Sequence, residues 1–327
     1  MKKSILKILK NNKDKFISGE KLSEEFDMTR SGIWKYIKML KEEGYDIESV
    51  PNKGYRIVSS PDILTLEEIE ENLNTSFIGR KIYYYDSINS TNDRAKEMAF
   101  EENEGTLVIA EEQTKGKGRL GRSWISPKGK GIWMSMILKP ELGPINAGSI
   151  TLLAAAAVHS ALKNLDINSE IKWPNDLLIE GKKAVGILTE MSAELNRINY
   201  IVIGIGINVN LNEEDIPEDL KARATSIKIT QNKKVDRKKL LSNILNEFEK
   251  LYIPFVREES TAHFLSICRE NSATIGRKVK IIKNKEEKGA KALDINEKGE
   301  LVVQYEDGKI ENVFSGEVSV RGNKGYI

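Results

Sequence analysis

The chain has 327 residues, of which 39% are hydrophobic and 31% charged, and its formal net charge is +2. This length predicts two or three domains, and the composition is that of a soluble globular protein. One cysteine and two histidines exclude an internal disulfide, a multi-cysteine metal site and histidine-rich metal or triad chemistry.

Charged residues interrupt the apolar stretches of the chain long before any of them reaches the length of a membrane span. The opening MKKSILKILK carries lysines every few residues instead of the continuous apolar core of a signal peptide. These two features predict a cytoplasmic protein without a membrane partner.

The first 60 residues hold 13 basic and 9 acidic side chains, so this segment is mildly basic. Its periodicity predicts three helices, of which the second is capped by Ser18 and the third ends at Gly44. Two short β-prone runs then flank the turn sequence PNKG. Helices joined by a short turn and followed by a hairpin are typical of a winged helix-turn-helix that binds DNA.

The third predicted helix, TRSGIWKYIKMLKEEGY, is the one expected to enter the major groove. Its apolar stripe comprises Ile33, Ile37 and Leu40, and its cations lie away from that stripe. A merely solvated face is the alternative interpretation of these cations. Trp34 is expected to be buried or in a packing contact. The predicted DNA-binding residues are Thr29, Arg30, Ser31, Lys35 and Lys38.

A polar SSPD segment at 59–62 is the predicted linker to a region that mixes helices and strands. The runs EIKWPNDLLI, KAVGILTEM and NYIVIGIGINVNL are each expected to form one strand, with tight connections between them. Consecutive strands of this kind pair antiparallel, and the helices are set apart from them. Residues 61–270 are therefore predicted to form an α+β domain with a mixed or antiparallel sheet.

The segment TKGKGRLGRSWISPKGKG, residues 114–131, contains six basic residues, five glycines and no acid. Gly116, Gly118 and Gly121 formally match a dinucleotide fingerprint, and the segment is one residue away from a P-loop. Both motifs require a helix directly after the glycines, whereas here Pro127 and a predicted strand follow. We predict a glycine-rich basic loop that wraps an anion. A flexible nucleic-acid-binding segment is the alternative.

The last 57 residues, 271–327, change character. Short β-prone runs alternate with turn sequences such as EKGE and EDGK. This pattern predicts a small all-β barrel or sandwich.

Several motifs, in order, resemble those of biotin protein ligases. GKGRLGRSW resembles their glycine–arginine signature, KWPNDLLIEGKKAVGILTEM their second signature, GIGINVN their third, and DSINSTND the segment that opens their biotin pocket. With the N-terminal helices, the whole chain resembles the bifunctional subgroup that is also the biotin operon repressor. Lys117 stands where the family loop usually has its first arginine, which keeps the charge but loses bidentate geometry.

The resemblance implies a multidomain α+β protein. The expected parts are a winged helix-turn-helix DNA-binding domain at 1–60, a biotin ligase catalytic domain at 61–270 and an SH3-like β barrel at 271–327. What the last domain does is left open between carrier docking and ATP affinity.

The implied enzyme is a biotin–[acetyl-CoA-carboxylase] ligase that uses ATP and Mg²⁺. It forms biotinyl-5′-AMP from biotin and ATP and then biotinylates a lysine of the biotin carboxyl carrier protein. No protein metal site is expected, because ATP carries the Mg²⁺. With adenylate bound, a homodimer is expected to bind operator DNA and repress biotin genes. The alternatives are a lipoate–protein ligase and a metabolite-sensing repressor without turnover.

The resemblance also assigns site residues. The expected catalytic residues are Lys183, Arg119 and Asp176, and Asp176 is a hypothesis for orienting the incoming lysine or taking its proton. The expected biotin contacts are Ser90, Thr91, Asn92, Gln113, Lys117, Gly118, Arg119 and Lys183. The expected ATP and adenylate contacts are Arg119, Arg122, Trp124, Asn175, Asp176 and Asn208.

Some of these residues have simpler alternative roles. A lysine in a turn, such as Lys183, is usually just solvated, and Ser90 and Thr91 could serve only to cap a helix. Residues 211–227 are polar and charged and follow a strand, and the resemblance implies that they form a mobile lid that orders over the adenylate. A plain surface loop is the alternative.

Overall fold

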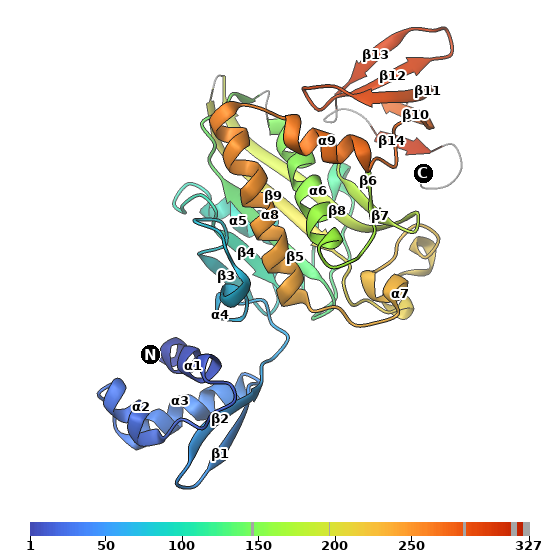
Figure 1. The fold of residues 1–327 in the computed structure, drawn as a ribbon. Coiled ribbons are helices and arrows are strands. Elements are labelled where there is room, and N and C mark those ends of the chain that lie inside the picture. Colours follow the sequence, from blue (N-terminus) through green and yellow to red (C-terminus); the bar gives the residue numbers. More distant parts are fainter. Residues whose placement is uncertain (145–146, 196, 284–285, 315–318, 323–327) are drawn as a thin grey trace. The chain divides into compact units, whose positions relative to one another are not determined.

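The computed structural model describes residues 1–144, 147–195, 197–283, 286–314 and 319–322. The chain divides into two compact units, Met1–Glu71 and Asn72–Ile327 (Figure 1). Among the described helices, none combines the length and the apolar character needed to cross a membrane.

The first unit contains three helices, a two-stranded hairpin and a short fourth helix. They are α1 (Lys2–Asn11), α2 (Gly19–Glu25), α3 (Arg30–Glu42), β1 (Asp46–Val50), β2 (Gly54–Ser59) and α4 (Leu66–Ile69), followed by η1 (Glu70–Asn72). The predicted caps are present, because Ser18 Oγ accepts a hydrogen bond from the Lys21 amide and Thr29 Oγ1 accepts one from the Gly32 amide. Apolar side chains from α1, α2, α3 and the antiparallel hairpin share one core.

Of the two expectations for Trp34, burial in the core was wrong, and the structure shows a contact on the helix surface instead. The Trp34 side chain is 53% exposed, whereas its neighbour Ile33 is fully buried. Successive residues of a helix point about 100° apart, so the residue after a core position lies on the flank of the helix. The Lys38 ammonium group lies 5.8 Å from the centre of the indole ring and covers part of it.

The second unit is built on a seven-stranded mixed sheet with the order β3-β4-β5-β9-β8-β7-β6 (Figure 1). Strands β3 and β4 are parallel, and every other neighbouring pair is antiparallel. The strands are β3 (Ile82–Tyr85), β4 (Leu107–Ala110), β5 (Ile132–Leu138), β6 (Glu170–Lys172), β7 (Asp176–Ile179), β8 (Lys182–Glu194) and β9 (Arg197–Ile207). The helices are α5 (Thr91–Met98), α6 (Ala147–Lys163), α7 (Ile227–Gln231), α8 (Arg237–Glu258) and α9 (Ala262–Glu270).

The run EIKWPNDLLI does not form the single strand that its apolar character predicted. It forms β6 and β7, which pair with each other across a turn that contains Trp173, Pro174 and Asn175. Proline has no backbone N–H to donate to a sheet, so a strand cannot easily continue through it. The turn carries the predicted site residue Asn175, and Asp176 follows it as the first residue of β7.

The two faces of the sheet carry different helices. Helix α6 packs beside α8 and against β8, and Thr151 of α6 lies 2.8 Å from Thr189 of β8 between their hydroxyl oxygens. Side chains alternate along a strand, so Gly186, Leu188 and Glu190 of β8 lie on the opposite face. Helix α5 packs on that opposite face, against β4, β5 and β9.

The C-terminal strands form a separate antiparallel sheet with the order β13-β12-β11-β10-β14. They are β10 (Lys278–Lys283), β11 (Glu286–Ile295), β12 (Leu301–Tyr305), β13 (Ile310–Val313) and β14 (Ser319–Gly322). A turn of this sheet contacts the central part of the unit, because the buried Trp173 indole N–H donates to the Gly299 carbonyl at 3.0 Å. The Trp173 amide also donates to Thr274 Oγ1 at 3.1 Å.

Candidate active site

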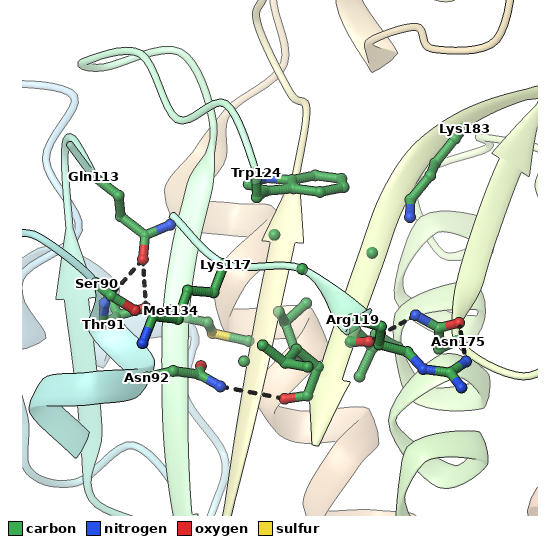
Figure 2. A pocket seen from close by; sticks show the side chains of 17 residues that line it. Ser90, Thr91, Asn92, Gln113, Lys117, Arg119, Trp124, Met134, Asn175 and Lys183 are labelled. Atoms are coloured by element: carbon green, nitrogen blue, oxygen red, sulfur yellow. Dashed lines mark hydrogen bonds between the residues drawn. The ribbon is translucent and has the colours of Figure 1, made fainter. Parts of the chain in front are cut away.

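Four neutral polar side chains gather where α5 begins. Ser90 caps this helix, and the Thr91 amide and hydroxyl both donate to Gln113 Oε1, at 2.8 and 3.0 Å. Gln113 Nε2 in turn donates to Ser126 Oγ at 2.9 Å. Figure 2 shows Ser90, Thr91, Asn92 and Gln113 together at one end of a pocket. Capping and pocket lining therefore coexist at this helix start.

The Asn92 amide has a fixed orientation. Its Nδ2 donates to Glu190 Oε2 at 2.8 Å, and its Oδ1 accepts from the Ser135 hydroxyl at 2.6 Å. Asn92 is only 4% exposed, so both bonds are shielded from water. The Glu190 carboxylate can only accept, so it assigns the nitrogen of the amide to this side and the oxygen to the side of Ser135.

Three glycines of β8 and β9 form the floor of this pocket. A Cβ at Gly204 would lie 2.1 Å from Asn92 Oδ1. Gly186 and Gly206 are directly opposite each other in the sheet, and a Cβ on either would lie 2.7 or 2.5 Å from the Trp124 indole. The absence of side chains at these positions lets Asn92 and Trp124 lie flat on the sheet.

The Trp124 side chain lies between the neutral polar end of the pocket and the Lys183 ammonium group (Figure 2). The Lys183 ammonium group lies 5.1 Å from the centre of its indole ring. The indole N–H is buried and has no hydrogen-bond acceptor among the described residues. An apolar face beside a cation suits a ligand with an aliphatic chain that ends in an anion.

The charged centre of the site consists of Lys183, Asp176 and Arg119, with the neutral side chain of Asn175 beside them. Lys183 Nζ lies 2.5 Å from Asp176 Oδ1. Arg119 Nη1 donates to Asn175 Oδ1 at 3.0 Å (Figure 2). Burial lowers the pKa of Arg119, the Asp176 charge opposes this, and the nearby Arg122 adds to it. Arginine stays protonated throughout, so the site holds two partly buried cations against one carboxylate.

The basic segment forms a hairpin rather than either phosphate-binding motif. Lys117 pairs with Ser123 across it, and the Gly118 amide donates to the Arg122 carbonyl at 2.7 Å. The chain then continues into the strand β5 and not into a helix. Lys117 Nζ turns to Asp93 Oδ1, at 2.7 Å, while Arg122 is exposed to solvent. The exclusion of the dinucleotide fingerprint and the P-loop is therefore correct.

Two adjoining pockets share the charged centre. The narrower one has an empty volume of about 450 Å³ and is lined by all eight predicted biotin contacts. The wider one, of about 1480 Å³, is lined by all six predicted adenylate contacts. Both are lined by Gly118, Arg119, Trp124, Asn175 and Lys183.

The wider pocket is bordered by residues 211–224, which fall within the predicted lid. They form two short 3₁₀ turns, η4 (Glu213–Asp215) and η5 (Glu218–Leu220). Asp215 pairs with Lys130 at 3.1 Å, and Ile216 packs with Trp133 and Leu211. These contacts place the segment beside the end of the basic region.

Several residues of the site were absent from the prediction. Ser135 and Glu190 orient Asn92 but come from distant strands, and no local pattern marks them. Gly186, Gly204 and Gly206 did leave a signal, because glycine weakens a strand interior and often marks a close approach of another group.

The residues predicted to contact DNA lie at the start and on the outer side of α3, and all five are exposed. Thr29 caps the helix, and Arg30 pairs with Glu20 at 2.7 Å. Lys35 and Lys38 point away from the core that contains Ile33 and Ile37.

Comparisons with known proteins cover nearly the whole chain. Residues 84–208 match the Biotin/lipoate A/B protein ligase family, residues 2–56 match an HTH domain, and residues 274–321 match the Biotin protein ligase C terminal domain. The Bifunctional ligase/repressor BirA of Bacillus spizizenii is 39% identical over 323 residues, which are 98% of each chain. Its counterpart in Escherichia coli is 31% identical over 94% of this chain and 93% of its own.

A solved structure is similar as well. It is the biotin protein ligase from Aquifex aeolicus in complex with biotin and ATP, with a TM-score of 0.65 and 32% sequence identity. The match covers 75% of this chain and 100% of that one.

Proposed function

This chain belongs to the biotin protein ligase family, in its bifunctional ligase/repressor branch, and on that premise we propose that it biotinylates a carrier protein and represses biotin genes. The substrates are biotin and ATP, and the acceptor is a lysine of the biotin carboxyl carrier protein of acetyl-CoA carboxylase. The helices of the first unit bind operator DNA, which the match to an HTH domain supports.

One observation supports the ligase reaction above all others. A pocket lined by neutral polar groups meets a larger pocket at the cations Lys183 and Arg119. Biotin has a neutral ureido ring at one end and a carboxylate at the other. In the narrow pocket its ring would lie near Thr91 and Gln113, and its chain would pass under Trp124. Its carboxylate would then reach the cations, where the α-phosphate of ATP enters from the wider pocket.

The first step joins two anions. A carboxylate oxygen of biotin attacks the α-phosphorus of ATP, the bond to pyrophosphate breaks, and biotinyl-5′-adenylate remains. Charge repulsion is a large part of this barrier, so cations that are already in place accelerate the step. Lys183 is held by Asp176 and Arg119 by Asn175, so neither has to reorganise when the substrates arrive.

The second step transfers the acyl group. The neutral amine of the carrier lysine attacks the acyl carbon, the bond to AMP breaks, and a proton leaves the nitrogen. Asp176 lines the adenylate pocket and is the carboxylate proposed to orient that lysine or take its proton. Asp176→Asn should slow transfer from preformed adenylate, and an unchanged rate in that half-reaction would remove Asp176 from this role.

We propose that Mg²⁺ binds together with ATP. Mg²⁺ in such sites is bound by one or two carboxylates and the substrate phosphates. The wider pocket suits this, because Asp176 and Asp215 line it, and the described residues contain no group of three metal-ligating side chains. The ion would neutralise phosphate charge when bound.

Pyrophosphate release is the experiment that tests the ligase. Release should require biotin, because the narrow pocket presents both hydrogen-bond donors and acceptors to a ureido ring. Equal release with lipoate would favour the related lipoate ligase reaction. Tight binding of biotin and ATP without any release would favour a repressor without turnover.

Regulation by ligand is the second part of the proposal. The adenylate-bound protein forms a homodimer that binds a palindromic operator. Ordering of residues 211–227 around the adenylate would couple the two events. Sedimentation with and without biotin and ATP tests this, and a monomer that ignores both the ligands and operator DNA would contradict it.

We also propose the finer division of the chain. Residues 1–60 form a winged helix-turn-helix, 61–270 the ligase domain and 271–327 an SH3-like barrel. The hairpin β1–β2 and the five-stranded antiparallel sheet support the first and last of these assignments.

A further inference from the structure

Lys117, the residue that departs from the family pattern, does not point its charge at the charged centre of the site. Its ammonium group lies 2.7 Å from Asp93 Oδ1, in the first turn of α5. Lys117 belongs to the glycine-rich hairpin, residues 113–126, and lines the narrow pocket together with Gly118. The contact with Asp93 therefore ties the wall of the pocket to the helix that starts at its polar end.

Asp93 is part of a chain of alternating charges. Lys96 Nζ lies 3.3 Å from the same Asp93 oxygen and 2.6 Å from Glu190 Oε1. Glu190 Oε2 accepts the hydrogen bond that fixes Asn92 in the pocket. The charges therefore alternate from the hairpin to the pocket wall, with one acid between the two lysines.

Asp93 differs from a solvated surface carboxylate because it has two cationic partners. Two ammonium groups bond the same carboxylate oxygen, and without its charge they would repel each other. Partial burial alone would raise the pKa of Asp93, but the hydrogen bonds from Lys117 and Lys96 lower it, so the carboxylate stays ionised at neutral pH. Loss of the charge would remove the attraction between Lys117 of the hairpin and α5.

We propose that the Lys117–Asp93 ion pair is a latch that holds the glycine-rich hairpin closed over the narrow pocket, and that Asp93 is a positioning residue for retention of biotin. This proposal rests on the proposed function only for the identity of the ligand. The latch itself is a property of the unliganded chain. Opening of the hairpin would uncover the pocket and release a bound ligand.

The primary test is the dissociation rate of biotin, measured by chase with excess unlabelled biotin. Asp93→Asn should speed dissociation by about three- to tenfold and change association less, because variants of one binding site differ mostly in their off-rates. Asp93→Glu keeps the charge and should stay within about twofold of the parent. Glu97→Gln, which removes an acid from the same helix where it pairs with Arg94, is the matched control and should also stay within about twofold.

Repeating the Asp93→Asn substitution in a Lys117→Gln variant separates the effect of the latch from other effects of Asp93. In Lys117→Gln protein the cation of the latch is missing, so Asp93→Asn should have little further effect. An undiminished effect in that background would overturn the proposal. So would an Asp93→Asn protein that releases biotin at the parental rate.

Limited proteolysis reports on the hairpin without any ligand. Trypsin should cleave after Lys117, Arg119 or Arg122 faster in Asp93→Asn than in Glu97→Gln. Equal cleavage would count against the latch. If the parent protein itself fails to retain biotin, the proposed function fails, and the cleavage rates still decide whether the latch exists.

Discussion

The glycine-rich hairpin and helix α3 are both rich in cations, yet they hold them in opposite ways. In and around the hairpin, each of three cations has a specific partner on another element, as Lys117 has Asp93, Arg119 has Asn175 and Lys183 has Asp176. On α3 the cations also have partners, such as Glu20 for Arg30 and Ser49 for Lys41, but they stand on an open helix face. The Arg30 side chain remains 70% exposed in spite of its pair with Glu20.

The difference follows from the size of the anion. A small ligand is bound once, in one geometry, so cations that are fixed beforehand lose little entropy on binding. A DNA duplex presents a long array of phosphates, and long mobile side chains on a helix can adjust to them. We propose that the same residue types serve two purposes and that exposure distinguishes them, since the Lys183 side chain is 23% exposed and that of Lys38 is 59% exposed.

The largest effect is expected from removing one of the cations that are held in place beside the two pockets. Lys183→Ala removes a cation from the junction of the two pockets and should slow biotin-dependent pyrophosphate release by about 100- to 1000-fold. Lys182→Ala is the matched control, since Lys182 is the exposed neighbour on the same strand, and it should leave the rate unchanged. Thermal melting of both proteins shows whether the fold is kept.

A smaller effect is expected from filling the floor of the pocket. Gly204→Ala places a methyl group against Asn92 and should weaken biotin binding by about ten- to a hundredfold, the range expected for overpacking. Gly289→Ala, at a strand glycine with open space around it, serves as the control. Calorimetric titration with biotin compares the two, and equal affinities would show that the floor tolerates a side chain.

Removing a cation from α3 should have a more modest effect. Lys35→Ala or Lys38→Ala should weaken operator binding several-fold, and each should lower the slope of log affinity against log salt by about one. Lys250→Ala removes an exposed charge from α8 in the second unit and should leave the slope unchanged. Fluorescence anisotropy over a salt series measures it, and an unaltered slope in the α3 variants would place the phosphates elsewhere.

The smallest effect is the one expected for biotin in salt. Raising the salt concentration from about 50 to 200 mM should change biotin affinity by less than about threefold, because the cations that meet it are partly buried and poorly screened. Operator affinity should fall far more over the same range. If the affinities for biotin and for operator DNA fell equally with salt, the proposed difference between fixed and mobile cations would be wrong.

The sequence predicted those parts of the fold and site that depend on local pattern. Helix periodicity and capping residues placed α2 and α3, and Pro127 excluded a helix after the basic segment. Trp34 was misassigned because large apolar side chains are usually buried, whereas a position on the flank of a helix can expose one. Pro174 likewise split a run that looked like one strand.

Partners that are distant in the sequence could not be predicted. Glu190 and Ser135 lie 98 and 43 residues from Asn92, and only the pairing of the strands brings them to it. The tie between Lys117 and Asp93 is of the same kind. Alternating glycines in GIGINVN are the exception, since their spacing of two already points to one face of a strand.

The hydrogen bond from the Trp173 indole to the Gly299 carbonyl connects the C-terminal sheet to the proposed nucleotide site. Trp173 lines the wider pocket and shares a turn with Asn175, so the C-terminal sheet supports part of the wall of that pocket. A protein cut back to residue 270 would leave that buried N–H without its acceptor, at a cost of about 1–3 kcal/mol. We expect such a truncated protein to lose affinity for ATP before it loses affinity for biotin.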